Sequence, residues 1–148
     1  MKLLTADIRK KMPGPRAQED SSDPMVYAKF FHPWTQWTWF AYEAWGMVYI
    51  DDHYEEVSLS MLSPKTDGGP GEHYIYLPQN ALGDTVPYFA YDVEDVIFFG
   101  LVYGDYTEYG SFSLAELWAN NVERDRHFEP KPLSQVKEEM RKLGYGEF

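Results

Sequence analysis

The sequence predicts an α+β fold, a single domain with a twisted, mainly antiparallel sheet, a short N-terminal helix and two C-terminal helices. Two aromatic-rich apolar stretches, Gln36–Trp45 and Val96–Tyr103, have the composition of central strands. Helical patterns occur near the ends of the chain and do not alternate with strands, which favours segregated elements over a βαβ arrangement. A chain of 148 residues fits one domain, residues 1–148, that buries a sizeable core.

The first helix is expected just after Thr5, whose hydroxyl suits an N-cap, with Asp7 in the first turn. Pro13-Gly14-Pro15 ends this helix, because proline removes a backbone donor and restricts the chain. Residues 16–24 are polar and rich in serine and aspartate, which predicts a mobile loop.

Residues 25–31 form a second strand pattern, joined to Gln36–Trp45 by a short link that favours an antiparallel hairpin. Period-two alternation predicts one face made of Trp37, Trp39, Ala41, Glu43 and Trp45. The residues between them are also largely apolar, so we expect both faces to be covered and the indole rings to lie in the core.

The middle and the end of the chain are less regular. Further strand patterns occur at residues 47–50, 57–62 and 73–77, and turns or loops are expected at 51–56, 64–71 and 104–110, while 79–87 is ambiguous. Gly100, inside the apolar stretch Val96–Tyr103, predicts a bulge or a close approach by another backbone. Ser113 and Glu116 have capping-box spacing at the start of one helix. Ser134 is expected to cap the last helix, which Gly144 closes.

Charge is distributed unevenly along a chain whose net charge is −11. Residues 1–16 have a local charge of +4, whereas residues 42–95 carry eleven acidic residues against one lysine, a local charge of −10. Solubility alone accounts for moderate acidity. The sharper alternative is an acidic face that repels nucleic acid and attracts a basic protein.

Other observations exclude whole classes of chemistry. The chain has no cysteine, so disulfides, thiolate zinc sites and cysteine nucleophiles are absent. Charged residues interrupt the apolar start, and no apolar segment is long enough to cross a bilayer. We therefore expect a cytoplasmic protein with no membrane partner.

Three blocks of sequence are similar to a known family. They are MKLLTADIRKKMP at the start, VYAKFFHPWTQWTWFAYE, and the run FFGLVYG…SFSLAELW…VERDRHFEPKPLS. In order and spacing they resemble the domain-of-unknown-function family number 2958, small bacterial proteins whose connection over the acidic middle section, at about 46–92, is shorter. The resemblance implies a passenger of plasmids, phages or integrative elements, and it brings no activity or catalytic residue with it.

Metal and cofactor sites have little support in the sequence. His32, His53, His73 and His127 occur in no paired ligand motif, so we expect no metal centre and no cofactor. The densest cluster, Asp51-Asp52-His53 with Glu55 and Glu56, has oxygen ligands suited to magnesium or calcium but lacks an EF-hand frame. A solvated turn is the favoured interpretation of that cluster.

Asp125 and His127 are the strongest catalytic candidates. In an extended segment they share one side with Glu123, and an Asp–His pair supports general base chemistry. Adjacent opposite charges in this run more often form ion pairs that tie a loop to its neighbours, so a structural role is favoured. We expect a non-enzymatic protein and keep a hydrolase as the third hypothesis.

Two binding hypotheses rank above the hydrolase. The first is a protein-interaction module of a mobile element, in which Asp51, Asp52, Glu55 and Glu56 imitate phosphates and inhibit a host nucleic-acid-binding defence protein. The second is a single-strand nucleic-acid binder, in which Trp34 and Trp37 stack on bases. The overall acidity argues against the second. Indole rings lining an open, positively flanked groove would reverse this order.

Overall fold

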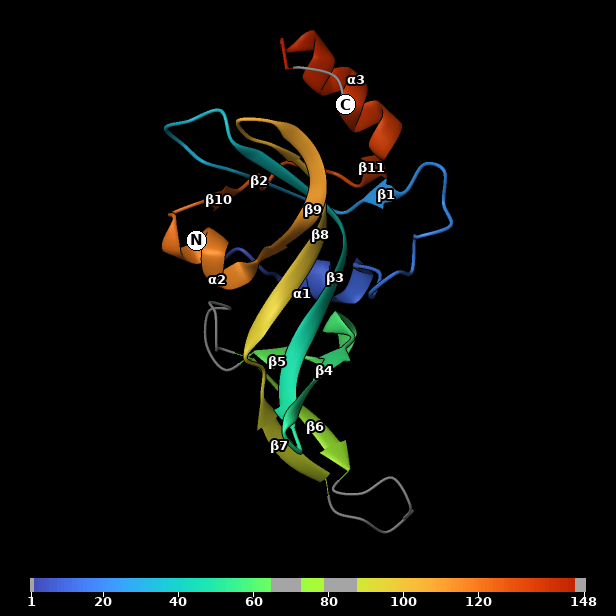
Figure 1. Ribbon diagram of the computed structural model, residues 1–148, viewed down its shortest axis with the longest axis vertical. Coiled ribbons are helices and arrows are strands. Elements are labelled where there is room, and N and C mark those ends of the chain that lie inside the picture. The colour runs from blue at the N-terminus through green and yellow to red at the C-terminus, as the bar shows by residue number, and fades with distance from the viewer. Residues whose placement is uncertain (1, 65–72, 79–87, 146–148) are drawn as a thin grey trace.

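The computed structural model describes residues 2–64, 73–78 and 88–145, and it has the expected α+β fold (Figure 1). The helices are α1 (Ala6–Lys11), α2 (Leu114–Ala119) and α3 (Leu133–Lys142), with a short 3-10 helix η1 (Leu59–Met61). The strands are β1 (Met25–Val26), β2 (Ala28–Phe31), β3 (Thr38–Ile50), β4 (His53–Val57), β5 (Ser63–Pro64), β6 (His73–Pro78), β7 (Tyr88–Asp92), β8 (Asp95–Tyr103), β9 (Thr107–Ser113), β10 (Glu123–Arg124) and β11 (Lys131–Pro132).

Strand β3 is the longest element and runs most of the length of the molecule beside β8 (Figure 1). In the described residues, the main sheet has the order β10-β2-β3-β8-β9, and β4 pairs with the second half of β3. Every strand pair that is described is antiparallel. Strands β5, β6 and β7 form a smaller sheet at the end opposite α3.

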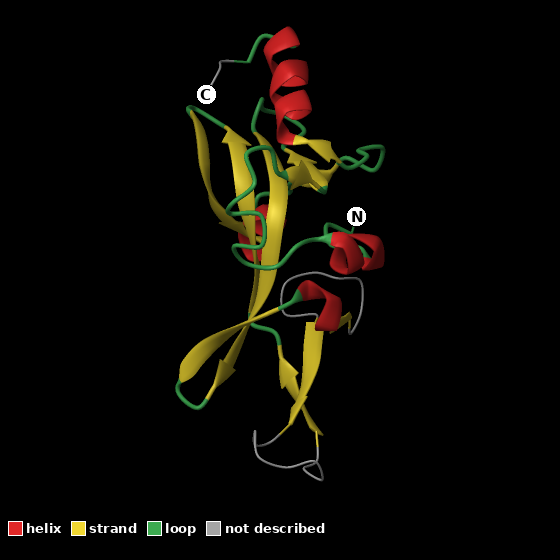
Figure 2. Cartoon of the chain, turned by 90° about the vertical axis from the view of Figure 1, so that its right-hand side faces the viewer, coloured by secondary structure: helices red, strands yellow, loops and turns green. Residues whose placement is uncertain are grey.

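The two faces of the main sheet are covered by different elements. On one face, α1, α2 and η1 bury a core centred on Phe30, Phe98 and Phe112, with ring centroids 5.2 Å apart for Phe30–Phe98 and 5.5 Å for Phe98–Phe112. On the other face, Leu133, Val136 and Met140 of α3 pack against Phe40, Tyr42, Leu101 and Tyr103. Because α3 reaches only one end of the sheet, the rest of that face is less covered (Figure 2).

A β-bulge changes the alternation predicted for β3. The register with β8 shifts between Ala41 and Glu43, so Tyr42 is an extra residue. Ala41, Ala44 and Val48 all belong to the first core, which places Glu43 and Trp45 on the opposite face from Ala41. The prediction of one face running from Trp37 to Trp45 was therefore wrong.

Gly100 confirms the expected close approach. It pairs with Ala41 at the bulge, and a Cβ atom built on it would lie 1.7 Å from the carbonyl oxygen of Phe40. No other residue type fits that position without moving a backbone, which explains glycine in the middle of an otherwise apolar strand.

The prediction that the indole rings of residues 36–45 lie inside the core was right for Trp39, which is buried, but Trp37 is 37% exposed and Trp45 is partly exposed. Trp34, which precedes that stretch, is 83% exposed. Residues flanking or following a strand receive no cover from its neighbours, and Trp34 and Trp37 precede β3 in a turn. Aromatic content alone did not distinguish these positions from the core.

Helix caps agree closely with the sequence, with one exception. Thr5 Oγ1 accepts the N–H of Ile8, and Ser113 and Glu116 form the capping box. The last helix starts at Leu133 with Pro132 as N-cap, so Ser134 is not its cap. Ser134 donates its backbone N–H and its hydroxyl to Asp23 instead, at 2.8 and 2.6 Å.

Several other segments differ from prediction. Strand β4 covers 53–57, of which 53–56 were expected in a turn, and the segment 57–62, expected as a strand, contains a 3-10 helix. Residues 107–113, of which 107–110 were expected as turn, form β9, because pairing with β8 provides hydrogen bonds that the local pattern did not reveal. The expected loop at 64–71 beyond Pro64 and the ambiguous segment 79–87 lie outside the described residues.

Candidate functional site

The four predicted acidic residues lie together on the hairpin formed by the end of β3 and β4, residues 46–57, here named the acidic hairpin. Ile50 pairs with His53, which leaves Asp51 and Asp52 as a two-residue turn with φ values of 49° and 65°. Left-handed backbone at both central residues is typical of tight hairpin turns, and aspartate tolerates it better than most residues. Figure 2 shows this hairpin diverging from the β6–β7 pair.

All four carboxylates of the acidic hairpin are exposed, but they differ in their partners. Glu56 pairs with Arg16, with Oε1 and Nη2 3.2 Å apart. Glu55 Oε1 lies 2.7 Å from Nε2 of His53, and this hydrogen bond is the main reason that the pKa of His53 is raised above its ordinary value. Within the described residues, the carboxylates of Asp51 and Asp52 have no ion-pair partner, so the tip is the most negative part of the hairpin.

Two exposed tyrosines accompany the carboxylates, and sequence reasoning missed them. Tyr49 and Tyr54 are directly opposite each other across the hairpin, with ring centroids 5.0 Å apart and exposed fractions of 48% and 57%. Tyrosine is enriched in protein interfaces because it combines large apolar area with a polar hydroxyl. Their nearly symmetric placement about the Asp51-Asp52 turn was the signal in the sequence.

Trp34 and Trp37 do not join the acidic residues. They lie in the turn before β3, so the whole 13-residue strand separates them from the hairpin tip, roughly 40 Å at 3.3 Å per residue. Trp34 contacts the ring of His32, and Trp37 contacts Trp39 and packs over Gly104. The predicted binding residues therefore form two separate surfaces.

Asp125 and His127 are close in the chain, but the hydrogen bond between them is local. Asp125 Oδ1 accepts the backbone N–H of His127 at 2.9 Å, and Oδ2 lies 3.6 Å from Nζ of Lys29. The carboxylate thus holds a turn and links it to β2, as the structural interpretation expected. It makes no hydrogen bond to the imidazole, so the hydrolase hypothesis gains no catalytic pair.

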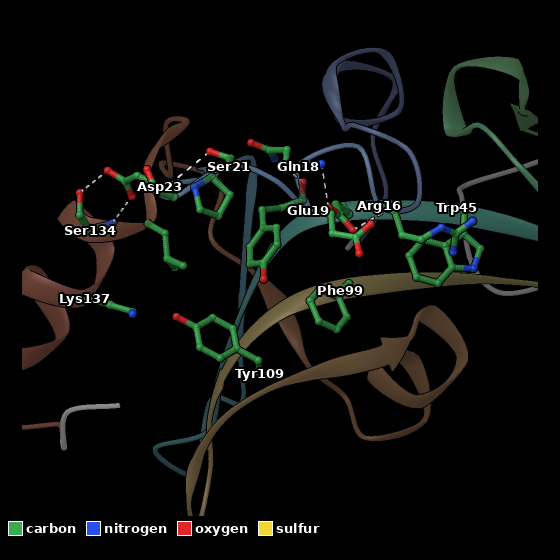
Figure 3. Close-up of a pocket in the computed structure, with 15 residues that line it drawn as sticks. Arg16, Gln18, Glu19, Ser21, Asp23, Trp45, Phe99, Tyr109, Ser134 and Lys137 are labelled. Carbon is green, nitrogen blue, oxygen red and sulfur yellow. Dashed lines mark hydrogen bonds between the residues drawn. The ribbon is translucent and has the colours of Figure 1, made fainter.

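An open groove of about 750 Å³, here named the aromatic groove, lies on the sheet face that carries α3 (Figure 3). It is lined by Arg16, Gln18, Glu19, Ser21, Ser22, Asp23, Pro24, Tyr42, Glu43, Trp45, Phe99, Tyr109, Leu133, Ser134 and Lys137. Lys137 and Ser134 stand at one end, Arg16 and Trp45 at the other, with Phe99 and Tyr109 between them. The sequence did not predict this groove, because its walls come from distant segments.

The loop that borders the aromatic groove is held by buried polar contacts. Glu43, only 5% exposed, accepts the backbone N–H of Arg16 at 3.0 Å and that of Gln18 at 2.9 Å. The side chain of Gln18 donates to the carbonyls of Met25 and Tyr42 and accepts the N–H of Met25. The segment expected to be a mobile loop is a loop, but it is anchored to β3 and β1.

The electrostatics of the aromatic groove are mixed. Burial, and then the nearby Tyr109 and Glu43, raises the pKa of Tyr42 to about 12. Two cationic residues line the groove, Arg16 and Lys137, against three acidic ones, Glu19, Asp23 and Glu43. One indole, that of Trp45, also lines it. The aromatic groove is therefore not positively flanked, so it does not meet the condition for preferring the nucleic-acid hypothesis.

In the described part of the chain, no three His, Asp or Glu side chains converge as ligands for a metal ion. No helix among those residues is long and apolar enough to span a membrane.

Comparison of the chain with protein-family models, with curated proteins and with solved structures gave no match. The resemblance to the domain-of-unknown-function family number 2958, and the mobile-element context that it implies, therefore stay predictions.

Proposed function

We propose that this protein is a non-enzymatic interaction module that binds a basic surface of a partner protein through the acidic hairpin. The observation that carries the proposal is the placement of four exposed carboxylates and two exposed tyrosines on one projecting two-stranded element. Asp51 and Asp52, at the turn, are the carboxylates free of described ion pairs. A rigid, unneutralised negative tip suits recognition of a cationic surface.

Charged and apolar groups of the hairpin have different parts in the proposed binding. Carboxylates steer association with a positively charged partner and set its orientation, more than they add raw affinity. The rings of Tyr49 and Tyr54 supply the apolar area on which affinity depends. The hairpin is rigidly supported, because Val48 of the same strand is fully buried in the core.

The charge pattern and the predicted family context suggest what the partner does. Carboxylates at the tip of a strand pair imitate the phosphates of a nucleic acid, so the proposed partner is a host defence protein with a DNA-binding or RNA-binding groove. We place the encounter in the cytoplasm, in keeping with the absence of cysteine.

The test neutralises the hairpin with Asp51→Asn, Asp52→Asn, Glu55→Gln and Glu56→Gln in one variant. The matched control neutralises four exposed acids elsewhere, Asp20, Asp105, Glu108 and Glu129, and so makes the same change in net charge. Partners captured by the wild-type protein are identified by mass spectrometry and their affinities are measured by calorimetry. We expect the hairpin variant to bind at least about tenfold more weakly, and the control variant to bind like the wild type.

Competition by double-stranded DNA separates phosphate mimicry from simple acidity. If the hairpin occupies a nucleic-acid groove, DNA displaces it from the partner. A partner that binds the hairpin variant as tightly as the wild type would refute the proposed function.

A second candidate function is single-strand nucleic-acid binding by the opposite end of β3. The observation in its favour is Trp34, whose 83% exposed ring is free to stack on a base. Titration with oligothymidylate at low salt, followed by tryptophan fluorescence, tests it. Binding that is lost in Trp34→Ala would support this candidate, and no quenching in the wild-type protein would end it.

A further inference from the structure

The aromatic groove contains a buried negative charge that no cationic side chain neutralises in the described residues. Glu43 is 95% buried, and its two oxygens accept only backbone N–H groups, from Arg16 and Gln18. The side chain of Arg16 turns to Glu56 of the acidic hairpin. A carboxylate in this position favours a cation in the groove, because burial strengthens electrostatic interactions.

Aromatic rings form much of the rest of the groove. Tyr42, Trp45, Phe99 and Tyr109 line it, and Tyr42 and Phe99 meet edge to face with centroids 5.7 Å apart. Rings beside carboxylates are the usual surroundings of a bound organic cation, since the ring faces carry negative charge density. The remaining acids, Glu19 and Asp23, add to this preference.

The side chain of Lys137 already contacts one of the aromatic rings of the groove. Lys137 Nζ lies 5.3 Å from the centroid of the Tyr109 ring, a cation–π distance. Lys137 stands at one end of the groove and Arg16 at the other, beside Trp45 (Figure 3), where the Arg16 guanidinium is paired with Glu56. The contact of Lys137 with Tyr109 shows that the geometry of this surface accepts an alkylammonium group.

We propose that the aromatic groove binds a lysine or arginine side chain presented by a basic peptide segment of the partner. This inference rests on the proposed function, and it adds a second contact site for the same partner. The groove volume of about 750 Å³ lies in the range of pockets that hold drug-sized molecules, so it accommodates a basic side chain together with its neighbours in the peptide.

The groove and the acidic hairpin are continuous on one face of the sheet. After the bulge, Glu43, Trp45, Met47 and Tyr49 lie on the same face of β3, and Tyr54 and Glu56 lie opposite the last two. The ion pair between Arg16 and Glu56 joins the groove wall to the hairpin. A basic segment that enters the groove can therefore continue along β3 to the tip.

The test uses a short acetylated and amidated peptide of alternating lysine and glycine. Its controls are the same peptide with acetyl-lysine, free butylammonium, and oligothymidylate. Affinities are measured by calorimetry, and the site is mapped by amide chemical shifts of the wild-type protein. We expect the lysine peptide to shift the amide signals of the groove residues. The control peptide that carries acetyl-lysine should bind at least about tenfold more weakly.

Three variants sharpen the test. Trp45→Leu should weaken binding of the lysine peptide about tenfold, whereas Trp45→Phe should retain most of it. Lys137→Gln should strengthen binding about threefold, because it removes a like charge from the groove. An anionic ligand would respond to Lys137→Gln in the opposite direction, so the sign of this change distinguishes the two classes.

The outcomes separate this inference from the proposed function. If the neutralised hairpin variant loses peptide binding while Trp45→Leu binds the peptide like the wild type, the groove site is overturned and the proposed function stands. Loss in Trp45→Leu with no effect of the hairpin variant supports the groove and refutes the hairpin. Oligothymidylate that binds the groove, or butylammonium that binds as tightly as the peptide, overturns the peptide proposal. Absence of any shift in the groove residues of the wild-type protein does so as well.

Discussion

The two halves of β3 have similar composition but opposite surroundings. Residues 38–44 are all buried, and 38–41 of them pair with β2. Residues 45–50 have one partly open face that carries Trp45, Met47 and Tyr49, and 46–50 of them pair with β4, while β8 pairs with parts of both halves. Both halves are rich in aromatic residues. An aromatic strand becomes core or contact surface according to what covers it, and α3 covers only the first half of this face.

The bulge at Tyr42 lies in the buried half, close to its boundary with the open half. After the bulge, each residue lies on the face opposite to the one that strict alternation would give it. Glu43 and Trp45 would otherwise point into the first core, and they line the aromatic groove instead. A single extra residue thus converts a buried strand into one that serves two surfaces.

The largest effect is expected from Gly100→Ala. The added Cβ would lie 1.7 Å from the carbonyl oxygen of Phe40, so the backbone of β3 or β8 must move. We expect a loss of about 3 kcal/mol in the free energy of unfolding and a Tm lower by roughly 6–12 °C. Urea denaturation and a thermal melt measure these changes.

Gly110 provides a matched control, because it lies directly opposite Gly100 on β9 and a Cβ there meets nothing within 4 Å. Gly110→Ala should be neutral or stabilise by about 0.5 kcal/mol, since alanine loses less conformational freedom on folding. Equal destabilisation by the two substitutions would mean that the close approach at the bulge is not what selects glycine.

Features of the fold that depend on neighbouring residues were predictable. Thr5 and the Ser113–Glu116 pair cap helices through contacts within one turn, and Gly100 signals crowding by its position in an apolar strand. Strand β9 was missed because its pairing with β8 is a tertiary interaction. Ser134 was misassigned because its partner, Asp23, is 111 residues away in the sequence.

An intermediate effect is expected from Glu43→Gln. The amide retains one acceptor oxygen, but its NH₂ group faces a backbone N–H donor of Arg16 or Gln18, so one hydrogen bond is lost in a buried site. We expect a loss of about 1–3 kcal/mol in the free energy of unfolding. Faster hydrogen exchange in residues 16–24 would show that the loop has loosened.

Glu56→Gln is the control for this substitution, since Glu56 is an exposed acid whose ion pair with Arg16 lies at the groove wall. Exposed ion pairs contribute less than about 1 kcal/mol, so the change in stability should be small. A larger loss from Glu56→Gln than from Glu43→Gln would contradict the contrast between the buried and the open half of β3.

The candidate site was predictable only where charge density marks it. Four acids within six residues marked this segment as a charged turn, and the β3–β4 hairpin, which was not predicted, brings them together. The aromatic groove was not predictable, because the bulge reverses the face of Glu43 and Trp45, and Asp23 and Lys137 arrive from segments far apart in the chain. The register between paired strands decides which side chains share a face, and a local sequence pattern does not contain that information.

The smallest effect concerns protonation of His53 at the tip. Its hydrogen bonds to Glu55 and to the backbone of Asp51 raise its pKa above the ordinary value of 6.5. Because the folded-state pKa is raised, the stabilisation from the charged imidazole is fully present below pH 6.5 and is lost as the pH rises through the folded-state pKa. We expect a titration midpoint above 6.5 in NMR spectra, which Glu55→Gln should lower by removing the negative charge from the principal hydrogen-bond acceptor.

The same titration bears on partner binding. Above the pKa of His53 the tip loses the positive charge of the imidazolium, so the hairpin becomes more negative and its affinity for a basic partner should rise. In His53→Gln this pH dependence should disappear while the affinity stays at its high-pH level. Binding that weakens across the His53 midpoint would mean that the imidazolium itself contacts the partner, and that the tip recognises an anion.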